Sequence, residues 1–356
     1  MQNIKKISKI FVINLIVLII IFLGLEIGAR IIYPEFHGHL HSPSLTMGKK
    51  KDFSFFYGFP TRVINQENSD DEDLPYVLVF GDSISEGYGH AFEDIWWNKL
   101  KRLLRIKNEN YNFKAIAGFG NNFSDNINNT NEILNKTNDL NITKIIYKFN
   151  FNDLTPQSRS SLNKKNKLET KISFSRKFAI WRYEHLNKSV FFRVIQYYAG
   201  VITKKTKGTC EERKLHALGP YTWTFGSRPY SEASSKAWLR FSNNIEKIKF
   251  ELDKKDIEFE IVIAPILMQI DKSGQHLYYN NRNYDFSCAT LDPISNLKKI
   301  AERLNIKVYD PTKYIKRHFD LRVKEGNFEP FFFTADENHI TPITSMYLAE
   351  YIAKKW

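Results

Sequence analysis

Cysteine is scarce in this chain of 356 residues, which contains Cys210 and Cys288 and no other. The two residues stand far apart, in no metal-ligand or redox spacing, and this excludes CxxC chemistry. If the domain lies outside the cytoplasm, the two thiols can pair as a disulfide. The sequence leaves the paired and the unpaired state equally open.

Signals for metal and nucleic-acid binding are also missing. His37, His39 and His41 alternate along an irregular segment without Cys ligands, so we predict no metal site. The formal net charge is +13, but Lys and Arg are scattered among Asn and Ile and form no recognisable motif. We therefore expect no nucleic-acid partner, and only a weak attraction to anionic membrane surfaces.

The overall composition is that of a globular protein, with 42% hydrophobic and 26% charged residues. The length allows one α/β domain with a sizeable core and some appended structure. We therefore expect one catalytic unit.

A long apolar run at residues 10–25, IFVINLIVLIIIFLGL, follows three lysines. Extension to Tyr33 supplies the length that a membrane helix needs, so we predict a transmembrane anchor at 10–33. A cleaved signal peptide is the alternative, but the residues after the run offer a poor A-x-A-like cleavage site. The lysines place residues 1–9 in the cytoplasm. We thus expect a single-pass protein of the inner membrane with its domain on the periplasmic or extracellular side.

Beyond the anchor, residues 34–73 contain scattered Pro, Gly and His, and we predict a tether there. The domain is expected at 74–356, with an inserted subdomain or lid at about 156–230. We predict strands at 76–80, 113–117, 145–149, 259–264 and 306–309, and helices at 92–104, 123–137, 232–254, 293–304 and from about 342. This alternation predicts an α/β fold, a parallel sheet with helices on both faces that binds ligands at the carboxyl ends of its strands.

The heptapeptide GDSISEG at positions 81–87 directly follows the first strand. This puts Ser83 at a strand end, where its hydroxyl can face a cleft. By themselves Gly, Asp and Ser are also the residues that a surface turn prefers. A serine hydroxyl becomes a useful nucleophile when a base takes its proton and a third group orients that base.

Asp336 and His339 offer both of these partners near the C-terminus. At this spacing the carboxylate can reach one ring nitrogen of His339 and leave the other nitrogen pointing at Ser83. An isolated DxxH near a helix start is more often a capping carboxylate with a surface histidine. Together with the serine motif, the pair predicts a Ser-His-Asp triad.

Acyl transfer also needs uncharged hydrogen-bond donors for the developing oxyanion. Asn152 follows the third strand, so its side-chain amide can reach the same strand-end cleft, although Asn-Asp is also a common turn. Gly120 follows the second strand, where a close backbone approach requires glycine. We predict an oxyanion hole formed by Ser83, Gly120 and Asn152.

In this order the motifs resemble the SGNH (GDSL) hydrolase family, of the membrane-anchored bacterial type. The shared pattern is GDSxSxG, a glycine after strand two, Asn-Asp after strand three and DxxH before the last helix. It covers about residues 74–356 apart from the insertion. The resemblance implies a flavodoxin-like sheet, with Ser83, Gly120, Asn152 and His339 as signature residues and Asp336 as the triad acid.

Three positions depart from the family pattern. Asn150 stands where the family has a glycine two positions before its Asn, Ala115 stands where an Asn is usual, and Gly118 competes with Gly120. These changes leave the triad untouched and concern the second oxyanion donor.

The resemblance implies a serine esterase that hydrolyses a carboxylic ester without a cofactor. Family members with one anchor and an external domain commonly act on acylated cell-surface carbohydrate, so we expect an O-acetylated glycan or a small acylated molecule as substrate. If a sugar hydroxyl replaces water, the same residues make an O-acyltransferase. A non-catalytic membrane-tethered scaffold on this fold is the third possibility.

Overall fold

A computed structural model of the chain describes residues 2–32, 53–56, 59–62, 71, 73–87, 90–118, 121, 123–137, 140–154, 189–192, 194–195, 198, 232–270, 294–327, 329, 331–332 and 339–356. For residues 2–11, 53–56, 59–62, 124, 125, 151, 152, 232–234 and 268 the description covers the backbone alone. The two cysteines, the three histidines between 37 and 41 and most of the predicted insertion lie outside these residues.

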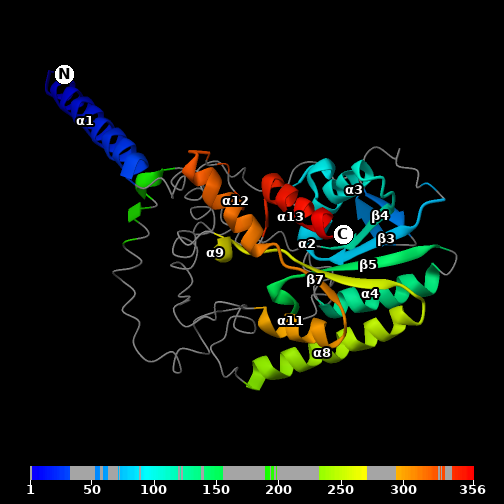
Figure 1. Ribbon diagram of the computed structural model, residues 1–356. Coiled ribbons are helices and arrows are strands. Elements are labelled where there is room, and N and C mark those ends of the chain that lie inside the picture. The colour runs from blue at the N-terminus through cyan, green and yellow to red at the C-terminus, as the bar shows by residue number, and fades with distance from the viewer. Residues whose placement is uncertain are drawn as a thin grey trace.

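Five parallel strands form the central sheet (Figure 1). They are β3 (Tyr76–Gly81), β4 (Asn112–Ala117), β5 (Ile142–Phe149), β6 (Glu258–Ile263) and β7 (Lys307–Tyr309). The spatial order is β4-β3-β5-β6-β7, and every neighbouring pair is parallel. Counted from the first strand of the sheet this is the flavodoxin-like order 2-1-3-4-5, which confirms the predicted fold. The strand order reverses between β3 and β5.

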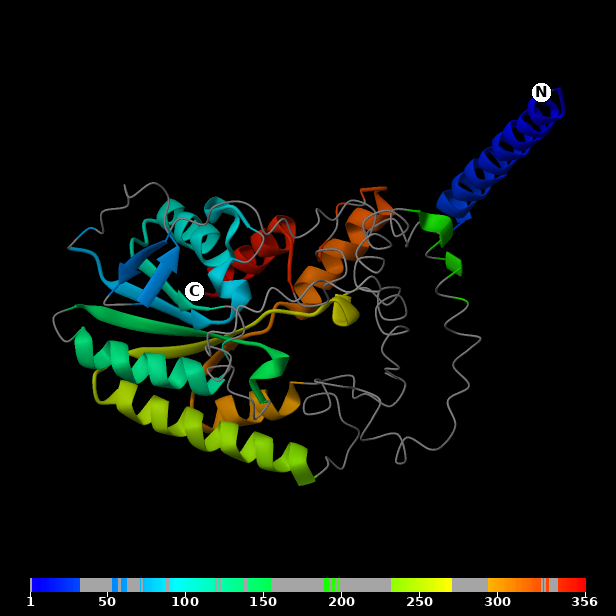
Figure 2. The same ribbon diagram turned by 180° about the vertical axis from the view of Figure 1, so that it is seen from behind.

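Helices cover both faces of this sheet (Figures 1 and 2). One face packs against α4 (Phe123–Lys136), α8 (Glu232–Asp253) and α11 (Ser295–Arg303), and the other against α3 (Trp96–Ile106) and α13 (Pro342–Lys355). In β3, Leu78 and Phe80 enter the first core and Val77 and Val79 the second. The strand reads as continuously apolar because successive side chains are buried on opposite faces.

Several elements differ from the sequence predictions. Phe92 lies in a separate 3-10 helix, η2 (Phe92–Asp94), because Ile95 has an extended backbone and delays the start of α3. The helices α9 (Leu267–Ile270) and α12 (Thr312–Lys324) were not predicted. An antiparallel pair, β1 (Phe53–Phe56) and β2 (Phe59–Arg62), occupies part of the predicted tether. Aromatic residues favour strands, and β2 lies against β4.

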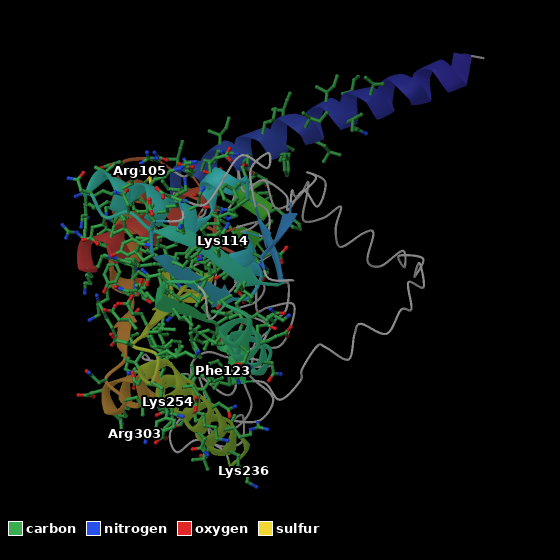
Figure 3. The ribbon with its side chains drawn as sticks, turned by 90° about the vertical axis from the view of Figure 1, so that its right-hand side faces the viewer. Arg105, Lys114, Phe123, Lys236, Lys254 and Arg303 are labelled. Atoms are coloured by element: carbon green, nitrogen blue, oxygen red, sulfur yellow. The ribbon has the colours of Figure 1, made fainter. Side chains whose placement is uncertain are left out.

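The N-terminal helix α1 (Gln2–Ile32) projects away from the domain. Within it Val12–Ile32, 21 residues, is long and apolar enough to cross a membrane. Its large apolar side chains are mostly exposed, and Figure 3 shows them extending into open space along the helix. A membrane anchor and a signal sequence share these properties, so the helix agrees with either role.

Candidate active site

Ser83 begins the short helix α2 (Ser83–Glu86) immediately after β3, where it is largely buried. Asp82 caps this helix, since its carboxylate accepts a hydrogen bond from the backbone N–H of Ile84 at 3.0 Å. Gly87 ends the helix with a φ of 79°, and a Cβ at this position would lie 2.5 Å from atoms of Ile95. The motif therefore makes a tight turn that fixes the serine at the carboxyl end of β3.

His339 is brought to this turn from 256 positions further along the chain. Its Nε2 lies 2.7 Å from Oγ of Ser83. The histidine directly precedes Ile340, which forms an isolated antiparallel bridge with Phe332, and α13 begins two residues later. The backbone N–H of Thr341 also donates to the carbonyl of Phe331 at 3.0 Å. The ring is thus held in front of α13 by a fixed backbone.

The other predicted site residues are described in part or not at all. Asn152 lies on η3 (Phe151–Leu154), directly after β5, but its side chain is outside the description. Gly120 and Asp336 also lie outside the described residues. Gly118 closes a turn after β4, since its carbonyl accepts from the N–H of Asn121 at 3.0 Å. The structure therefore brings Ser83 and His339 together, and the roles of the other three residues stay predictions.

No protein-family model and no curated protein matches the sequence. Solved structures do match. A lipolytic protein of the G-D-S-L family from Veillonella parvula shares 15% identity over 79% of this chain and 97% of its own, with a TM-score of 0.37. A lipase/acylhydrolase from Enterococcus faecalis shares 12% identity, with 79% and 95% covered and a TM-score of 0.39.

A catalytic mutant of an acetylxylan esterase from Geobacillus stearothermophilus is similar as well, with 12% identity, 79% and 93% covered and a TM-score of 0.38. The structural neighbours are SGNH and GDSL esterases and lipases. TM-scores below 0.5 leave the chemistry of this chain to be inferred from its own residues.

A buried ion pair, which the motifs did not predict, holds the residue that precedes Ser83. Nζ of Lys148 lies 2.8 Å from Oδ1 of Asp82, and both side chains are buried. The side-chain amide of Asn150 donates to the second carboxylate oxygen of Asp82. Burial by itself raises the pKa of Asp82, but the charge of Lys148 and these hydrogen bonds outweigh it and lower that pKa. Asp82, which directly precedes Ser83, is thus held in its ionised form.

A second buried carboxyl, Asp153, lies beside this pair. It accepts from the hydroxyl of Tyr147 at 2.5 Å and from the backbone N–H of Asn150 at 2.6 Å. Its Oδ1 has no hydrogen-bond partner among the described residues. Burial, together with the nearby charge of Asp82, raises the pKa of Asp153 to about 7. The two neighbouring carboxyls therefore have separated pKa values, one low and one near neutrality.

His90 ties the segment after the serine helix to the backbone beside His339. Its Nε2 lies 2.6 Å from the carbonyl oxygen of Ile340, and its Nδ1 lies 3.0 Å from that of Asp94. Burial lowers the pKa of His90, which favours the neutral ring. A neutral imidazole has one N–H and donates to one of these carbonyls at a time. His90 therefore fixes the backbone next to the histidine that contacts Ser83.

One signal in the sequence, not used in the predictions above, could have revealed these supporting residues. Lys148 interrupts an otherwise apolar buried strand, and a buried lysine requires an acidic partner. The departure at Asn150 belongs to the same network, since the amide that replaces the family's glycine binds Asp82. His90 lies in a connection and gives no signal in the sequence pattern.

Proposed function

We propose that this chain is a membrane-anchored serine esterase with Ser83 as nucleophile and His339 as general base. The observation that carries the proposal is the 2.7 Å contact between Nε2 of His339 and Oγ of Ser83. This distance allows proton transfer between the two atoms. The pair lies at the carboxyl end of β3, where the strand order reverses and where sheets of this class bind ligands.

In the first half of the reaction, His339 takes the hydroxyl proton as Oγ of Ser83 attacks the ester carbonyl carbon. The C–O bond to the alcohol then breaks, and His339 returns the proton to the leaving oxygen. We assign oxyanion stabilisation to the backbone N–H groups of Ser83 and Gly120 and to the side-chain amide of Asn152. Asp336 is assigned the role of orienting His339.

In the second half, water attacks the acyl-serine while His339 takes a water proton. The Oγ–C bond breaks, the proton returns to Ser83 and the carboxylic acid leaves. If a sugar hydroxyl takes the place of water, the product is a new ester. For the natural substrate we propose an O-acetyl group on an extracytoplasmic carbohydrate, which rests on the family resemblance and on the apolar N-terminal helix.

The test measures hydrolysis of p-nitrophenyl acetate by the full chain in detergent. We expect Ser83→Ala to lower turnover by at least about a thousand-fold, because the variant lacks the nucleophile. Ser85→Ala is the matched control, since this buried serine lies on the same helix and its hydroxyl has no hydrogen-bond partner among the described residues. The control should retain most of its activity.

The outcomes separate the candidate functions. Turnover that survives in Ser83→Ala would contradict the assigned nucleophile. A burst of one equivalent without turnover indicates a transferase that lacks its acceptor. Absence of both turnover and labelling of Ser83 by a fluorophosphonate would indicate a non-catalytic scaffold.

A further inference from the structure

A single acidic residue, Glu26, lies within the apolar span of α1, and it contacts the insertion. Its carboxylate accepts hydrogen bonds from the hydroxyl of Ser189 at 2.7 Å and from the N–H groups of Val190 at 3.0 Å and Phe191 at 3.1 Å. Arg30, one turn further along α1, pairs with the same carboxylate at 2.8 Å. The charge that interrupts the apolar run is therefore fully engaged.

Apolar contacts continue this junction. The rings of Phe22 and Phe191 meet edge to face, with centroids 6.2 Å apart. Val190 and Ala29 are buried. In contrast, Ile195 and Tyr198 are 47% and 44% exposed. This part of the chain is the short green segment beside the end of α1 in Figure 1. Its exposed apolar side chains therefore belong to a segment that contacts the anchor.

We infer that the described residues of this segment, 189–192, 194–195 and 198, form a second contact with the lipid bilayer, which Glu26 holds against the anchor. Glu26 is six residues before the end of the span, about 9 Å along the helix axis, which places it inside the outer half of the hydrocarbon region. Acidic residues at such depth are costly unless paired, and the insertion supplies the partners. Tyrosine is enriched at the membrane–water boundary, where Tyr198 would lie.

The contact has two consequences. A cleaved signal sequence would take Glu26 with it, so only a chain that retains the helix can make the proposed contact. A second contact also fixes the orientation of the domain. In Figures 1 and 2, α1 lies on the side of the domain toward which the strands run, where α9 follows β6. The site edge of the sheet is thus turned toward the membrane side.

The inference rests on the anchor in the proposed function but not on its chemistry, and photocrosslinking tests it. A photoreactive benzoylphenylalanine replaces Ile195 or Tyr198 in the full chain, reconstituted in vesicles of equal parts phosphatidylethanolamine and phosphatidylglycerol. We expect lipid adducts by mass spectrometry at both positions. Phe250 is 60% exposed and belongs to α8, a helix that lies away from α1 in Figures 1 and 2. It is the matched control and should give none.

The same label at Leu18 tests the anchor separately. Adducts at Leu18 without adducts at Ile195 and Tyr198, or equal yields at Phe250, would overturn the inference. Absence of adducts at Leu18 would overturn the anchor as well, whereas the esterase proposal is decided by hydrolysis of p-nitrophenyl acetate.

Two further variants test the contact between Glu26 and residues 189–191. Glu26→Ala should lower the adduct yield at Ile195 and Tyr198 several-fold and leave the yield at Leu18 unchanged. Ser189→Ala removes the hydrogen bond to Glu26 and the one that Oγ of Ser189 accepts from the N–H of Phe192, but it leaves the backbone bonds to Glu26 in place. It should act in the same direction with a smaller effect. Unchanged yields at both positions in Glu26→Ala would show that Glu26 does not hold the segment.

Discussion

A Lys–acid ion pair lies near each end of the parallel strands, which we call the amino edge and the carboxyl edge of the sheet. The two pairs differ in their neighbours and in their burial. Lys144 and Lys148 stand four residues apart on β5 and point to the same face, at the amino and the carboxyl edge respectively. Both pair with acids, Lys144 with Glu260 at 3.1 Å and Lys148 with Asp82 at 2.8 Å. The exposed fraction is 8% for Lys144 and 1% for Lys148. The two ion pairs are therefore of the same kind, but the one at the carboxyl edge is more completely buried.

At the amino edge the charges are shared among several groups. Glu260 also accepts from the hydroxyl of Tyr309 at 3.2 Å and lies 3.5 Å from Nζ of Lys307. Lys144 lies 3.0 Å from a carboxylate oxygen of Glu258, a residue whose side chain is 68% exposed. An open cavity of about 510 Å³ lies here, lined by residues of both charges. Lys144 and Glu260, the two buried charges of this network, therefore each have more than one partner.

At the carboxyl edge, Lys148 has Asp82 as its one charged partner among the described residues. The acid at the same time caps the helix that begins with Ser83. Loss of Lys148 would leave Asp82 with its hydrogen bonds from Asn150 and Ile84 but without a counter-charge, directly beside Ser83. The difference indicates that the amino edge stabilises the sheet, whereas the carboxyl edge positions the serine.

The strongest test of this difference is Lys148→Met. Removal of one partner leaves Asp82 buried without its counter-charge, so we expect the free energy of unfolding to fall by about 3–5 kcal/mol. Hydrolysis should fall as well, because the cap of α2 depends on Asp82. Urea denaturation and turnover of p-nitrophenyl acetate measure the two effects.

The double variant Lys148→Met with Asp82→Asn is the matched control. Asn keeps an oxygen for the N–H of Ile84 and removes the uncompensated charge. We expect it to recover part of the lost stability. If the double variant is less stable than Lys148→Met alone, the pair is not the cause of the loss.

A smaller effect of the carboxyl edge is a pH dependence through Asp153. Its native pKa of about 7 exceeds the usual value for an unfolded chain, so the native state binds the additional proton. The resulting stabilisation is complete below about pH 4 and is lost as the pH rises through about 7. Relative to Asp153→Asn, the wild type should lose about 2–3 kcal/mol of unfolding free energy between about pH 5 and pH 8.

Urea denaturation of both proteins at the two pH values makes the comparison. Glu251→Gln, at an exposed position of α8, is the control and should follow the wild type. Parallel behaviour of the wild type and Asp153→Asn would show that Asp153 keeps an ordinary pKa.

The sequence was sufficient for the sheet because its strands are buried on both faces and read as apolar runs. It failed for α12, which buries Ile315 but is otherwise rich in Lys and Arg and follows a strand of three residues. It also failed for the β1–β2 pair, whose short aromatic segments lie in a polar surrounding. The local sequence pattern of such short or highly charged elements does not show that they pack against the rest of the domain.

For the site, the sequence identified the two residues that the structure brings together, Ser83 and His339. It did not identify the partner of Lys148, because Asp82 lies 66 positions away. Only the register of β3 and β5, in which Phe80 pairs with Tyr147, places the two side by side. His90 was missed for the same reason, since Ile340 is 250 positions away.

The smallest expected effect is that of Lys144→Met at the amino edge. Glu260 keeps Lys307 and Tyr309 as partners, and Glu258 is exposed to solvent, so no charge is left buried alone. We expect a loss of about 1 kcal/mol in the free energy of unfolding and unchanged turnover of p-nitrophenyl acetate. The same substitution at Lys148 is the matched comparison. Equal losses of stability and activity at the two positions would show that Lys144 and Lys148 act alike. That result would contradict a specific link between Lys148 and the position of Ser83.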